Sequence, residues 1–458
     1  MDQGVERVRR SRRFPLPETV VGAWVVGVAG LLVLGADLLW VVALGDAARR
    51  VGGLPDGIPF ASAPQLDWPN PALLAEVLLS LVDGLGWWAL PALHLLLVAG
   101  TLLVLVSDAR RLGARDGRIA LAASLVVVGG STALVVVRFP SLSLVPFVTL
   151  VWLLRREADR PSRAIWLVPP LVVLWGNLHG AVLVGIAVLG VFVLAGRGHG
   201  FVRRAVVGLL SLSALVLTSA GLRTPEYYLA ALGNEAAVRG TDLWAAPSPT
   251  NPLDVAMVAC GVVLLALAAR RLTRWEWLVV AGLLVGTADA ARHGIWLLLF
   301  LAPVAAAGAR RSTVREGDGQ STPATTRVGA AALVVVAVVA VGLVGVQLVR
   351  REDRVRPPGH ALVPELRRIA GDRPVLAKEP EAETFARDGI TVWAANPVDA
   401  FTRETQVGFL DFLHDCRIPD PALAVAVVDD ECESVLAQAG WQVESRLHDL
   451  VVLSKRTS

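Results

Sequence analysis

Long apolar runs separated by short polar segments fill the first 349 residues of the chain. The first run extends from residue 20 to residue 44, and ten more follow near 86–107, 119–137, 141–154, 164–178, 180–196, 205–219, 253–269, 275–288, 294–309 and 328–349. A straight helix needs roughly 20 apolar residues to cross a bilayer, and several runs are shorter, which favours tilted or partly re-entrant segments. The pattern predicts an α-helical polytopic membrane protein with about eleven transmembrane helices.

The pattern changes after residue 350, where Pro357-Pro358-Gly359 is followed by short apolar segments that alternate with polar helical ones. Strands are predicted near 374–377, 390–394, 424–428, 442–445 and 450–454, and helices near 403–414 and 431–438. This order predicts a small α/β domain with a largely parallel sheet. The expected organisation is a basic N-terminus over 1–19, a transmembrane domain over 20–349 and the α/β domain over 350–458.

The composition agrees with a membrane protein. Hydrophobic residues make up 54% of the 458 residues, charged residues only 18%, and the mean hydropathy is +0.58. Soluble domains carry about 25% charged residues, so a purely soluble enzyme and a disordered chain are both disfavoured. Three cysteines are too few for a disulfide-dense scaffold.

The distribution of arginine predicts the orientation. If the N-terminus is cytoplasmic, the cytoplasmic segments hold 23 Lys and Arg and the opposite loops hold six. The positive-inside rule and an odd number of spans then place residues 350–458 outside a bacterial plasma membrane. That outer region has 14 Lys and Arg against 19 Asp and Glu, a net −5, which leaves +8 for the rest. No nucleic-acid-binding motif is present, so the basic excess is a topology signal and no nucleic-acid partner is expected.

Two of the three cysteines, Cys416 and Cys432, fall in the outer domain, whereas Cys260 lies inside an apolar run. Because the outer compartment is oxidising and the loop between them would be short, we expect a disulfide between Cys416 and Cys432. The domain has no glycine-rich phosphate loop, so its α/β pattern predicts no nucleotide site.

Polar residues gather at the predicted outer ends of the helices. The set mixes acids, bases, an amide and histidines: Asp37, Asp46, Glu76, Arg138, Asn177, His179, Glu226, Glu235, Asp242, Asp289, Arg292 and His293. Such a mixture on one side of the membrane favours a site for proton transfer or ion coordination. The cytoplasmic loops carry mainly arginine, which topology alone explains.

Asp37 and the turn Asn177-Leu178-His179-Gly180 are the most informative members of this set. Asp37 lies 17 residues after Val20, about 26 Å along a helix, near the outer edge of the hydrocarbon core. A carboxylate there needs a polar cavity or a partner, unless it simply reaches headgroup water. The turn divides a 33-residue apolar stretch and leaves Asn177 and His179 at the outer surface, where the alternative is that they only form and cap the turn.

Several short motifs resemble those of a known superfamily. Asp37-Leu38-Leu39-Trp40, followed by Trp68-Pro69-Asn70 and Glu76, is similar to the first outer loop of bacterial proteins related to the C-type (GT-C) glycosyltransferases. The motifs Trp175–Gly180 and Arg292-His293-Gly294 resemble two others of that group, and Val392–Phe401 resembles the soluble tail of its actinobacterial members.

The resemblance implies a GT-C-like fold and a polyprenyl-phosphate lipid as the sugar donor. In the superfamily an acidic residue of the first outer loop serves as base or metal-linked group, and Asp37 matches that position. Asp37 is therefore the expected general base, and Glu76 is expected to orient the acceptor or a metal. Arg138, His179 and Arg292 are expected to bind the departing phosphate, and Asn177 and His293 complete the expected substrate-binding set.

The predicted function is inverting glycosyl transfer from a polyprenyl-phosphate donor to a cell-envelope acceptor. This single-site hypothesis requires Asp37, His179 and Arg292 to lie together. The alternative is a non-catalytic protein for envelope assembly or lipid binding that keeps the same fold. It is favoured by Val41, where relatives often have His, and by the lack of an Asp-x-Asp pair, which also leaves a divalent metal with little support. A transporter has least support, because no ionisable residues follow the middle of several spans.

Overall fold

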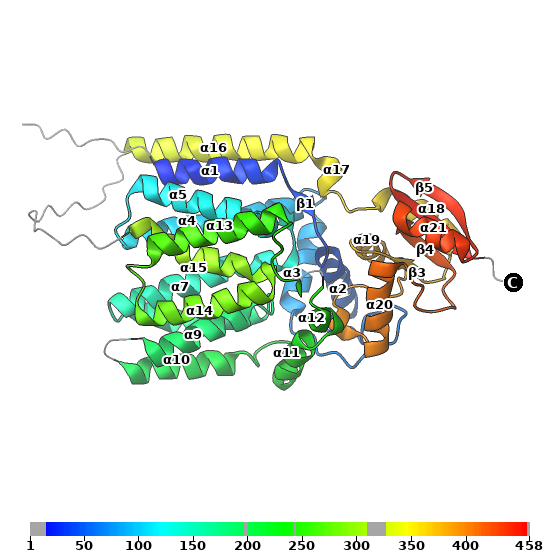
Figure 1. The fold of residues 1–458 in the computed structure, drawn as a ribbon, viewed down its shortest axis with the longest axis horizontal. Coiled ribbons are helices and arrows are strands. Elements are labelled where there is room, and N and C mark those ends of the chain that lie inside the picture. Colours follow the sequence, from blue (N-terminus) through cyan, green and yellow to red (C-terminus); the bar gives the residue numbers. More distant parts are fainter. Residues whose placement is uncertain (1–14, 197–199, 242–243, 309–326, 456–458) are drawn as a thin grey trace, which may run out of the picture.

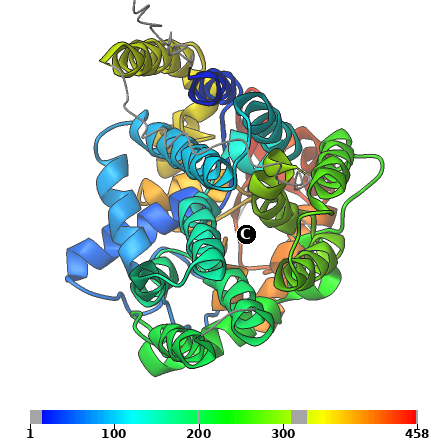
Figure 2. The same ribbon diagram turned by 90° about the vertical axis from the view of Figure 1, so that its left-hand side faces the viewer.

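The computed structural model describes residues 15–196, 200–241, 244–308 and 327–455. Long helices pack side by side along one part of the molecule, and a small domain that contains a sheet sits at one end of them (Figure 1). We call the end of the helix bundle that carries this domain the domain end, and the opposite end the basic end. Figure 2 looks along the bundle and shows its helices roughly parallel to one another.

Among the bundle helices of the described chain, the first holds the beginning of the first apolar run, and ten others correspond to the later runs. They are α1 (Leu16–Ala29), α4 (Ala89–Arg111), α5 (Asp116–Gly129), α7 (Leu144–Asp159), α8 (Val168–Gly176), α9 (Val182–Ala195), α10 (Phe201–Ala214), α13 (Pro252–Ala268), α14 (Arg274–Asp289), α15 (Gly294–Ala307) and α16 (Arg327–Arg350). Every residue of α15 is buried, so this helix forms the centre of the bundle. A helix that is apolar on all sides is buried in this way.

The structure does not confirm eleven spans. Among the described helices, α4 and the segment Phe139–Asp159 are long and apolar enough to cross a membrane, and six further apolar helices have 10–17 residues. Several apolar runs are composite: the run near 164–178 begins as the 3-10 helix Arg163–Leu167 and continues as α8. The run near 119–137 likewise contains α5, the short α6 (Ser131–Val135) and a strand.

The first apolar run is not one helix, so that prediction is wrong. Helix α1 ends at Ala29 beside Gly30, and the chain continues as the two-residue strand β1 (Val33–Leu34) before α2 (Leu38–Val51) begins. Glycine weakens a helix, and β1 instead finds backbone partners by pairing in parallel with β2 (Val136–Val137). Asp37 is therefore the N-cap residue of a second helix, not a residue far along the first.

Shorter helices lie at the domain end: α2, α3 (Leu73–Asp83), α11 (Thr224–Leu232) and α12 (Glu235–Arg239) (Figure 1). Helix α3 packs closely on α2, since a Cβ added to Gly45 would lie 2.0 Å from the carbonyl oxygen of Glu76. The apolar run 72–82, which is too short to span a membrane, thus forms a helix at the end of the bundle.

The C-terminal region contains α17 (Glu352–Val355), α18 (Val363–Ala370), α19 (Glu381–Arg387), α20 (Arg403–Asp415) and α21 (Asp430–Gln438). Its sheet has the order β3-β4-β6-β5, from β3 (Val375–Ala377), β4 (Val425–Asp429), β5 (Trp441–Leu447) and β6 (Leu450–Lys455). The small α/β region is present as predicted, but the expectation of a largely parallel sheet is wrong. Only β3 and β4 pair in parallel, because β5 and β6 are joined by a two-residue turn and must run antiparallel.

The core of this C-terminal region also includes residues from the segment after α1. Trp40 and Leu44 of α2, with Ile58 and Phe60, are buried in the same cluster as β3, β4 and β6. Trp40 meets Phe60 edge-on with ring centroids 4.6 Å apart. Isolated backbone bridges also join Ala61 to Val392 and Gln65 to Phe401. Residues 350–458 therefore do not form their core alone.

Ion pairs fasten the C-terminal region to the domain end. Arg387 of α19 pairs with Asp83 of α3 at 2.6 Å, and Arg403 of α20 pairs with Glu235 of α12 at 2.6 Å. Arg239 of α12 pairs with Asp411 of α20 at 2.8 Å. Within the region, Cys416 and Cys432 form a disulfide, with Cα atoms 5.4 Å apart.

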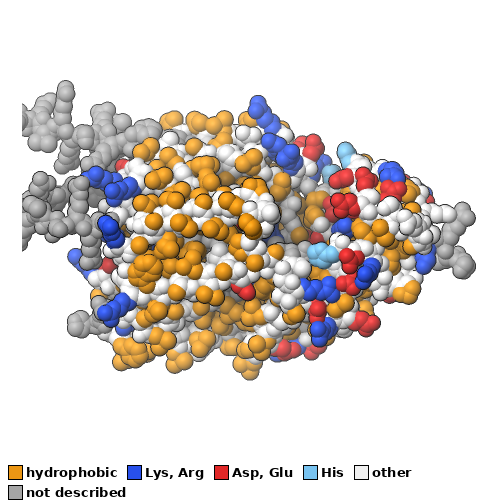
Figure 3. Space-filling model, viewed as in Figure 1, with side chains coloured by type: hydrophobic (Ala, Val, Ile, Leu, Met, Phe, Trp, Pro, Cys, Tyr) orange, Lys and Arg blue, Asp and Glu red, His pale blue; other side chains and the backbone are white. Residues whose placement is uncertain are grey.

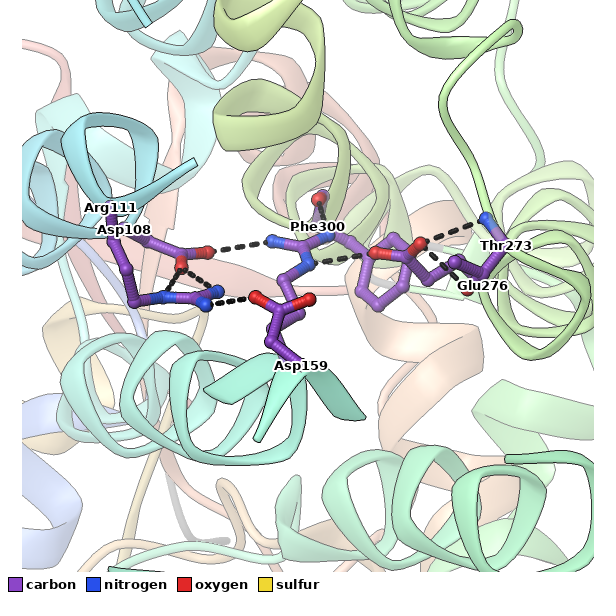
Figure 4. Close-up of polar contacts among 7 residues, drawn as sticks. Asp108, Arg111, Asp159, Thr273, Glu276 and Phe300 are labelled. Atoms are coloured by element: carbon purple, nitrogen blue, oxygen red, sulfur yellow. Dashed lines mark hydrogen bonds and ion pairs between the residues drawn. The ribbon is translucent and has the colours of Figure 1, made fainter. Parts of the chain in front are cut away.

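A buried ionic network joins four helices at the basic end (Figure 4). Arg155 of α7 donates from Nε to Glu276 of α14 and from Nη1 to Asp108 of α4, both at 2.9 Å. Its Nη2 donates to the carbonyl oxygen of Phe300 in α15 at 2.6 Å. Arg155 is only 3% exposed, so this residue is not the solvated loop charge that the sequence suggests.

Charges are absent from most of the side of the bundle that Figure 3 shows. Hydrophobic side chains cover the bundle in this view, Lys and Arg gather at its basic end, and acids, bases and histidines mix around the domain end. This division separates the two ends chemically, and the mixed end is the place to look for a site.

Candidate functional site

Two segments distant in sequence meet where the short parallel strands end. Leu34 pairs with Val137, and the Gly35 N–H donates to the Val137 carbonyl oxygen at 3.1 Å. The carboxyl ends of paired parallel strands lie at the same edge, so the residues that follow are neighbours. Asp37 Oδ2 accordingly lies 3.4 Å from Arg138 Nη2, with the two side chains 20% and 22% exposed.

Gly35 is required for this approach. A Cβ at this position would lie 2.4 Å from Val136 Cγ1 and 2.8 Å from Arg138 Cγ. Both distances are shorter than real carbon contacts, so any side chain here would push the two strands apart. The glycine therefore lets the Asp37 segment lie against the Arg138 segment.

Asp37 itself has an unusual backbone conformation. Its φ of 78° is in the left-handed region, and its side chain makes no capping hydrogen bond to α2. The carboxylate of Glu383, from α19, lies at this helix terminus and accepts the backbone N–H of Asp37 at 2.6 Å. Burial, followed by the negative charge of Asp37, raises the pKa of Glu383 to about 8.

His179 lies in the turn between α8 and α9. Its Nδ1 accepts the Ala181 N–H at 3.0 Å, which leaves the proton of the neutral ring on Nε2. The ring packs edge-on against Phe139, the residue after Arg138, with centroids 4.8 Å apart. Burial, followed by the positive charges of Arg292 and Arg138, lowers the pKa of His179 to about 3. His179 is therefore a neutral hydrogen-bond donor at physiological pH.

Arg292 comes from the short 3-10 helix Ala291–His293 that joins α14 to α15. Its guanidinium lies over the ring of Trp244, 3.5 Å from the centroid. The Ala291 N–H donates to the Ala245 carbonyl oxygen at 2.9 Å and holds the Trp244 segment in place. Asp37 and Arg138 are both near enough for their charges to act on Arg292. The structure thus brings Asp37, Arg138, His179 and Arg292 together from four segments.

Glu76, on α3, is linked to this group through Tyr227, on which the charges of Glu76 and Asp37 both act. It is 1% exposed, its Oε1 accepts Asn70 Nδ2 at 2.6 Å, and its Oε2 has no hydrogen-bond partner among the described residues. Burial, opposed by the Asn70 bond, raises the pKa of Glu76 to about 7. Glu76 is therefore poised to exchange a proton near neutral pH.

No role for Asp399 or Glu383 follows from the sequence, and Trp68 enters only as part of a motif. Contacts and charges nevertheless place all three near Asp37. Asp399 Oδ2 accepts Trp68 Nε1 at 2.9 Å, and burial raises the pKa of Asp399, with Asp37 adding to the shift. Tyr227 lies edge-on to Trp68, with centroids 6.1 Å apart. Asp399 falls within the Val392–Phe401 motif, which is a usable signal, whereas nothing in the sequence marks Glu383 among the other acids of its region.

Asn177 and His293 have structural positions near the group. Asn177 Nδ2 donates to the carbonyl oxygens of Val173 at 2.9 Å and Leu217 at 2.7 Å, which supports the turn that carries His179. His293 is half-buried as the N-cap residue of α15, next to Arg292. Both predicted residues thus adjoin the group, and Asn177 already uses its amide hydrogens on backbone acceptors.

The remaining polar candidates lie apart from the group or support it from outside. Asp46 accepts from Ser80 Oγ at 2.6 Å, and Glu226 forms an exposed pair with Arg223. Glu235 forms the ion pair with Arg403 that joins α12 to α20, and Asp289 is the last residue of α14. Asp242 lies outside the described residues. In the described part of the chain, no three His, Cys, Asp or Glu side chains gather as a metal site would require.

Several buried polar atoms in the domain-end elements have no hydrogen-bond partner among the described residues. They are Trp40 Nε1, Arg138 Nε, Tyr228 Oη and Thr384 Oγ1, in addition to Glu76 Oε2. Leaving such an atom unsatisfied costs about 1–3 kcal/mol, so each of these atoms needs a partner such as a water molecule or a bound ligand. Such atoms also occur elsewhere in the described chain, as at Ser162 Oγ and Ser211 Oγ, but at the domain end they lie in the elements that carry the polar group.

The helical bundle with its sheet-containing C-terminal region has a GT-C-like fold. The structure is similar to the crystal structure of ArnT from Cupriavidus metallidurans bound to undecaprenyl phosphate. The similarity covers 97% of this chain and 98% of that chain, with a TM-score of 0.56 and 16% sequence identity. The sequence itself matches no protein-family model and no curated protein.

Proposed function

We propose that the protein is a membrane glycosyltransferase that moves a sugar from a polyprenyl-phosphate donor to a cell-envelope acceptor. One observation carries the proposal: Asp37, Arg138, His179 and Arg292 converge at the domain end from four segments of the chain. Support comes from the ArnT structure, which has a similar fold and undecaprenyl phosphate bound.

The chemistry follows from the group types. Asp37 accepts the proton of an acceptor hydroxyl, whose oxygen attacks the anomeric carbon of the sugar from the face opposite the phosphate. The bond between that carbon and the phosphate oxygen breaks, and its electron pair leaves with the polyprenyl phosphate. The guanidiniums of Arg138 and Arg292 and the Nε2–H of His179 stabilise the charge on the departing phosphate.

Glu76 would orient the acceptor, because its Oε2 is buried without a partner in the described chain. The aromatic rings of Trp68 and Tyr227 lie beside Asp399 and offer an apolar surface with a carboxylate edge, which suits a sugar. A metal is not needed for these roles, since two guanidiniums already supply positive charge at the phosphate.

The site is expected to face away from the cytoplasm. Figure 3 supports this orientation, because Lys and Arg gather at the basic end, as the positive-inside rule expects of a cytoplasmic side. The C-terminal region would then lie outside the plasma membrane, over the site.

Transfer from a radiolabelled polyprenyl-phosphate sugar tests the proposal directly. Purified wild-type protein, Asp37→Asn and the control Asp46→Asn are incubated with the donor and an envelope extract as acceptor. Turnover by Asp37→Asn should fall by about 100-fold or more, since a general base contributes at least that factor. Asp46→Asn should retain most activity, because Asp46 bonds Ser80 outside the group.

Equal turnover by the wild type and Asp37→Asn would remove Asp37 from the mechanism. If the wild type transfers no label from any of several donor sugars, the non-catalytic alternative is favoured. Binding of unlabelled polyprenyl phosphate by the inactive protein would then identify it as a lipid-binding protein with the same fold.

A further inference from the structure

The N-terminus of α2 is capped from the far end of the sequence. Glu383 Oε1 accepts the N–H of Asp37 at 2.6 Å, and Glu383 Oε2 accepts those of Leu39 at 3.2 Å and Trp40 at 3.4 Å. In α2, Asp37 is the N-cap residue and Leu39 and Trp40 occupy the second and third helical positions. These amides have no acceptor within the helix and are the ones that a capping side chain normally takes.

Aspartate is one of the residues that ordinarily provide this cap themselves. A self-capping residue adopts an extended backbone and turns its own carboxylate back to the second and third amides. Asp37 does not, because its φ is 78° and its side chain makes no capping bond. Its carboxylate instead faces Arg138, at 3.4 Å. Glu383 caps the helix instead, so the Asp37 carboxylate is available to the site.

The surroundings of Glu383 fix it in this role. Its side chain is fully buried, and α19 is held on α3 by the ion pair between Arg387 and Asp83. A left-handed aspartate costs free energy relative to the extended form, so the conformation needs support from its surroundings. The three amide bonds provide that support from the C-terminal region.

We infer that Glu383 is a positioning residue that holds Asp37 in the left-handed conformation required for its carboxylate to face Arg138. The C-terminal region is then part of the site and not a separate binding module. The requirement that Asp37 face Arg138 for catalysis rests on the proposed function. Without Glu383, Asp37 relaxes to the extended form, caps α2 with its own carboxylate and withdraws from Arg138.

The experiment compares Glu383→Ala, Glu383→Gln and Glu383→Asp with the control Arg387→Gln. Glutamine keeps the shape but sets an amide NH2 against backbone N–H groups, whereas aspartate keeps the carboxylate. Arg387 lies on the same helix and also joins it to the domain end, but it contacts Asp83 and not α2. The control thus loosens the docking of α19 without removing the cap.

Hydrogen–deuterium exchange of peptides covering residues 37–41 measures how well Glu383 protects these amides, and it needs no assay of activity. In Glu383→Ala the amides of Leu39 and Trp40 should exchange about tenfold faster or more, because nothing else in the helix protects them. Glu383→Gln keeps one acceptor oxygen, so it should expose either the Asp37 amide or those of Leu39 and Trp40. Glu383→Asp should restore part of the protection, and Arg387→Gln should keep it. Unchanged exchange in Glu383→Ala would overturn the inference.

Transfer from the radiolabelled polyprenyl-phosphate sugar tests whether Glu383 also positions Asp37 for catalysis. We expect kcat to fall about 10- to 100-fold in Glu383→Gln with KM for the donor nearly unchanged, because a misplaced base costs turnover and not binding. Equal losses in Glu383→Gln and Arg387→Gln, or full kcat in Glu383→Gln, would refute positioning. A wild type without transfer would contradict the proposed function, whereas the exchange data would still decide whether Glu383 holds these amides.

Discussion

At the scale of single residues, the two expected catalytic carboxylates have opposite surroundings. Asp37 faces the Arg138 guanidinium and is 20% exposed, whereas Glu76 is 1% exposed and has only the Asn70 amide as a partner. A charge without a cation in a buried position is costly, which is why burial raises the pKa of Glu76 to about 7. The difference suits Asp37 to act as a base and Glu76 to hold a proton near neutral pH.

The raised pKa of Glu76 predicts a pH-dependent stability. Between pH 4.5 and about 7 the unfolded chain releases the Glu76 proton while the folded protein keeps it. Unfolding then releases a proton, so the free energy of unfolding falls as the pH rises through this window and stays low above it. We expect Glu76→Gln to remove this part of the pH dependence and to be more stable than the wild type at pH 8, by about 1–3 kcal/mol.

Thermal unfolding of the detergent-solubilised protein at pH 5 and pH 8 checks this prediction. The midpoint of the wild type should fall more between the two pH values than that of Glu76→Gln. Glu226→Gln is the matched control, because Glu226 is exposed and paired with Arg223, and it should keep the wild-type dependence. An identical fall in wild type and Glu76→Gln would show that Glu76 does not hold its proton in the fold.

At the scale of elements, the sequence predicts most of the apolar helices and four of the five C-terminal strands, while the segment near 390–394 makes only isolated bridges at Val392. The successes depend on local patterns of hydrophobicity, which the sequence contains. It does not predict β1 or β2, since two-residue strands inside apolar runs leave no alternation to detect. The site depends on that pairing, which places Asp37 beside Arg138. The group of four could be expected from its residue types and depth, but its support by Glu383 is a contact across 343 to 346 positions in the sequence.

The basic-end network shows the same limit in another form. Arg155 directly follows an apolar run, where the sequence indicates an exposed arginine in a loop. In the structure it is buried and bonds to residues of α4, α14 and α15. Asp108 also accepts from Arg111 at 2.9 Å, and Glu276 also accepts the N–H of Thr273 at 2.9 Å (Figure 4). Charge counts cannot distinguish such a residue from an exposed one, because the distinction arises only when the helices pack.

Removing Arg155 should destabilise the bundle strongly. Arg155→Ala leaves Asp108 and Glu276 without this cation, and breaking a buried ion pair in this way costs about 3–5 kcal/mol. The neighbouring Arg156 is exposed, so Arg156→Ala should change stability by less than about 1 kcal/mol. Thermal unfolding midpoints of the two variants at one pH and one detergent concentration measure the difference. Similar midpoints for both would mean that the network contributes little.

At the scale of the whole molecule, the two ends are built for different tasks. The basic end closes the bundle with a network in which Arg155 uses Nε, Nη1 and Nη2 on acceptors. At the domain end the left-handed Asp37 and the unsatisfied Glu76 Oε2 cost stability, although unsatisfied buried atoms also occur elsewhere in the described chain, as at Ser162 Oγ. The two ends therefore differ in their chemistry: Arg155 uses all its guanidinium nitrogens on acceptors at the basic end, whereas acids, bases and histidines mix at the domain end.

This polarity predicts which end faces out of the cell. Single cysteines in a Cys260→Ser background, Ala246→Cys at the domain end and Arg160→Cys at the basic end, occupy exposed positions. A membrane-impermeant maleimide added to intact cells should label Ala246→Cys and leave Arg160→Cys unlabelled until the cells are permeabilised, because the positive-inside rule predicts that the arginine-rich end faces the cytoplasm. The disulfide between Cys416 and Cys432 keeps those thiols from reacting in the oxidised protein. The reverse pattern would place Asp37 on the cytoplasmic side, where an acceptor in the cell envelope could not reach it, and the proposed transfer would have to be abandoned.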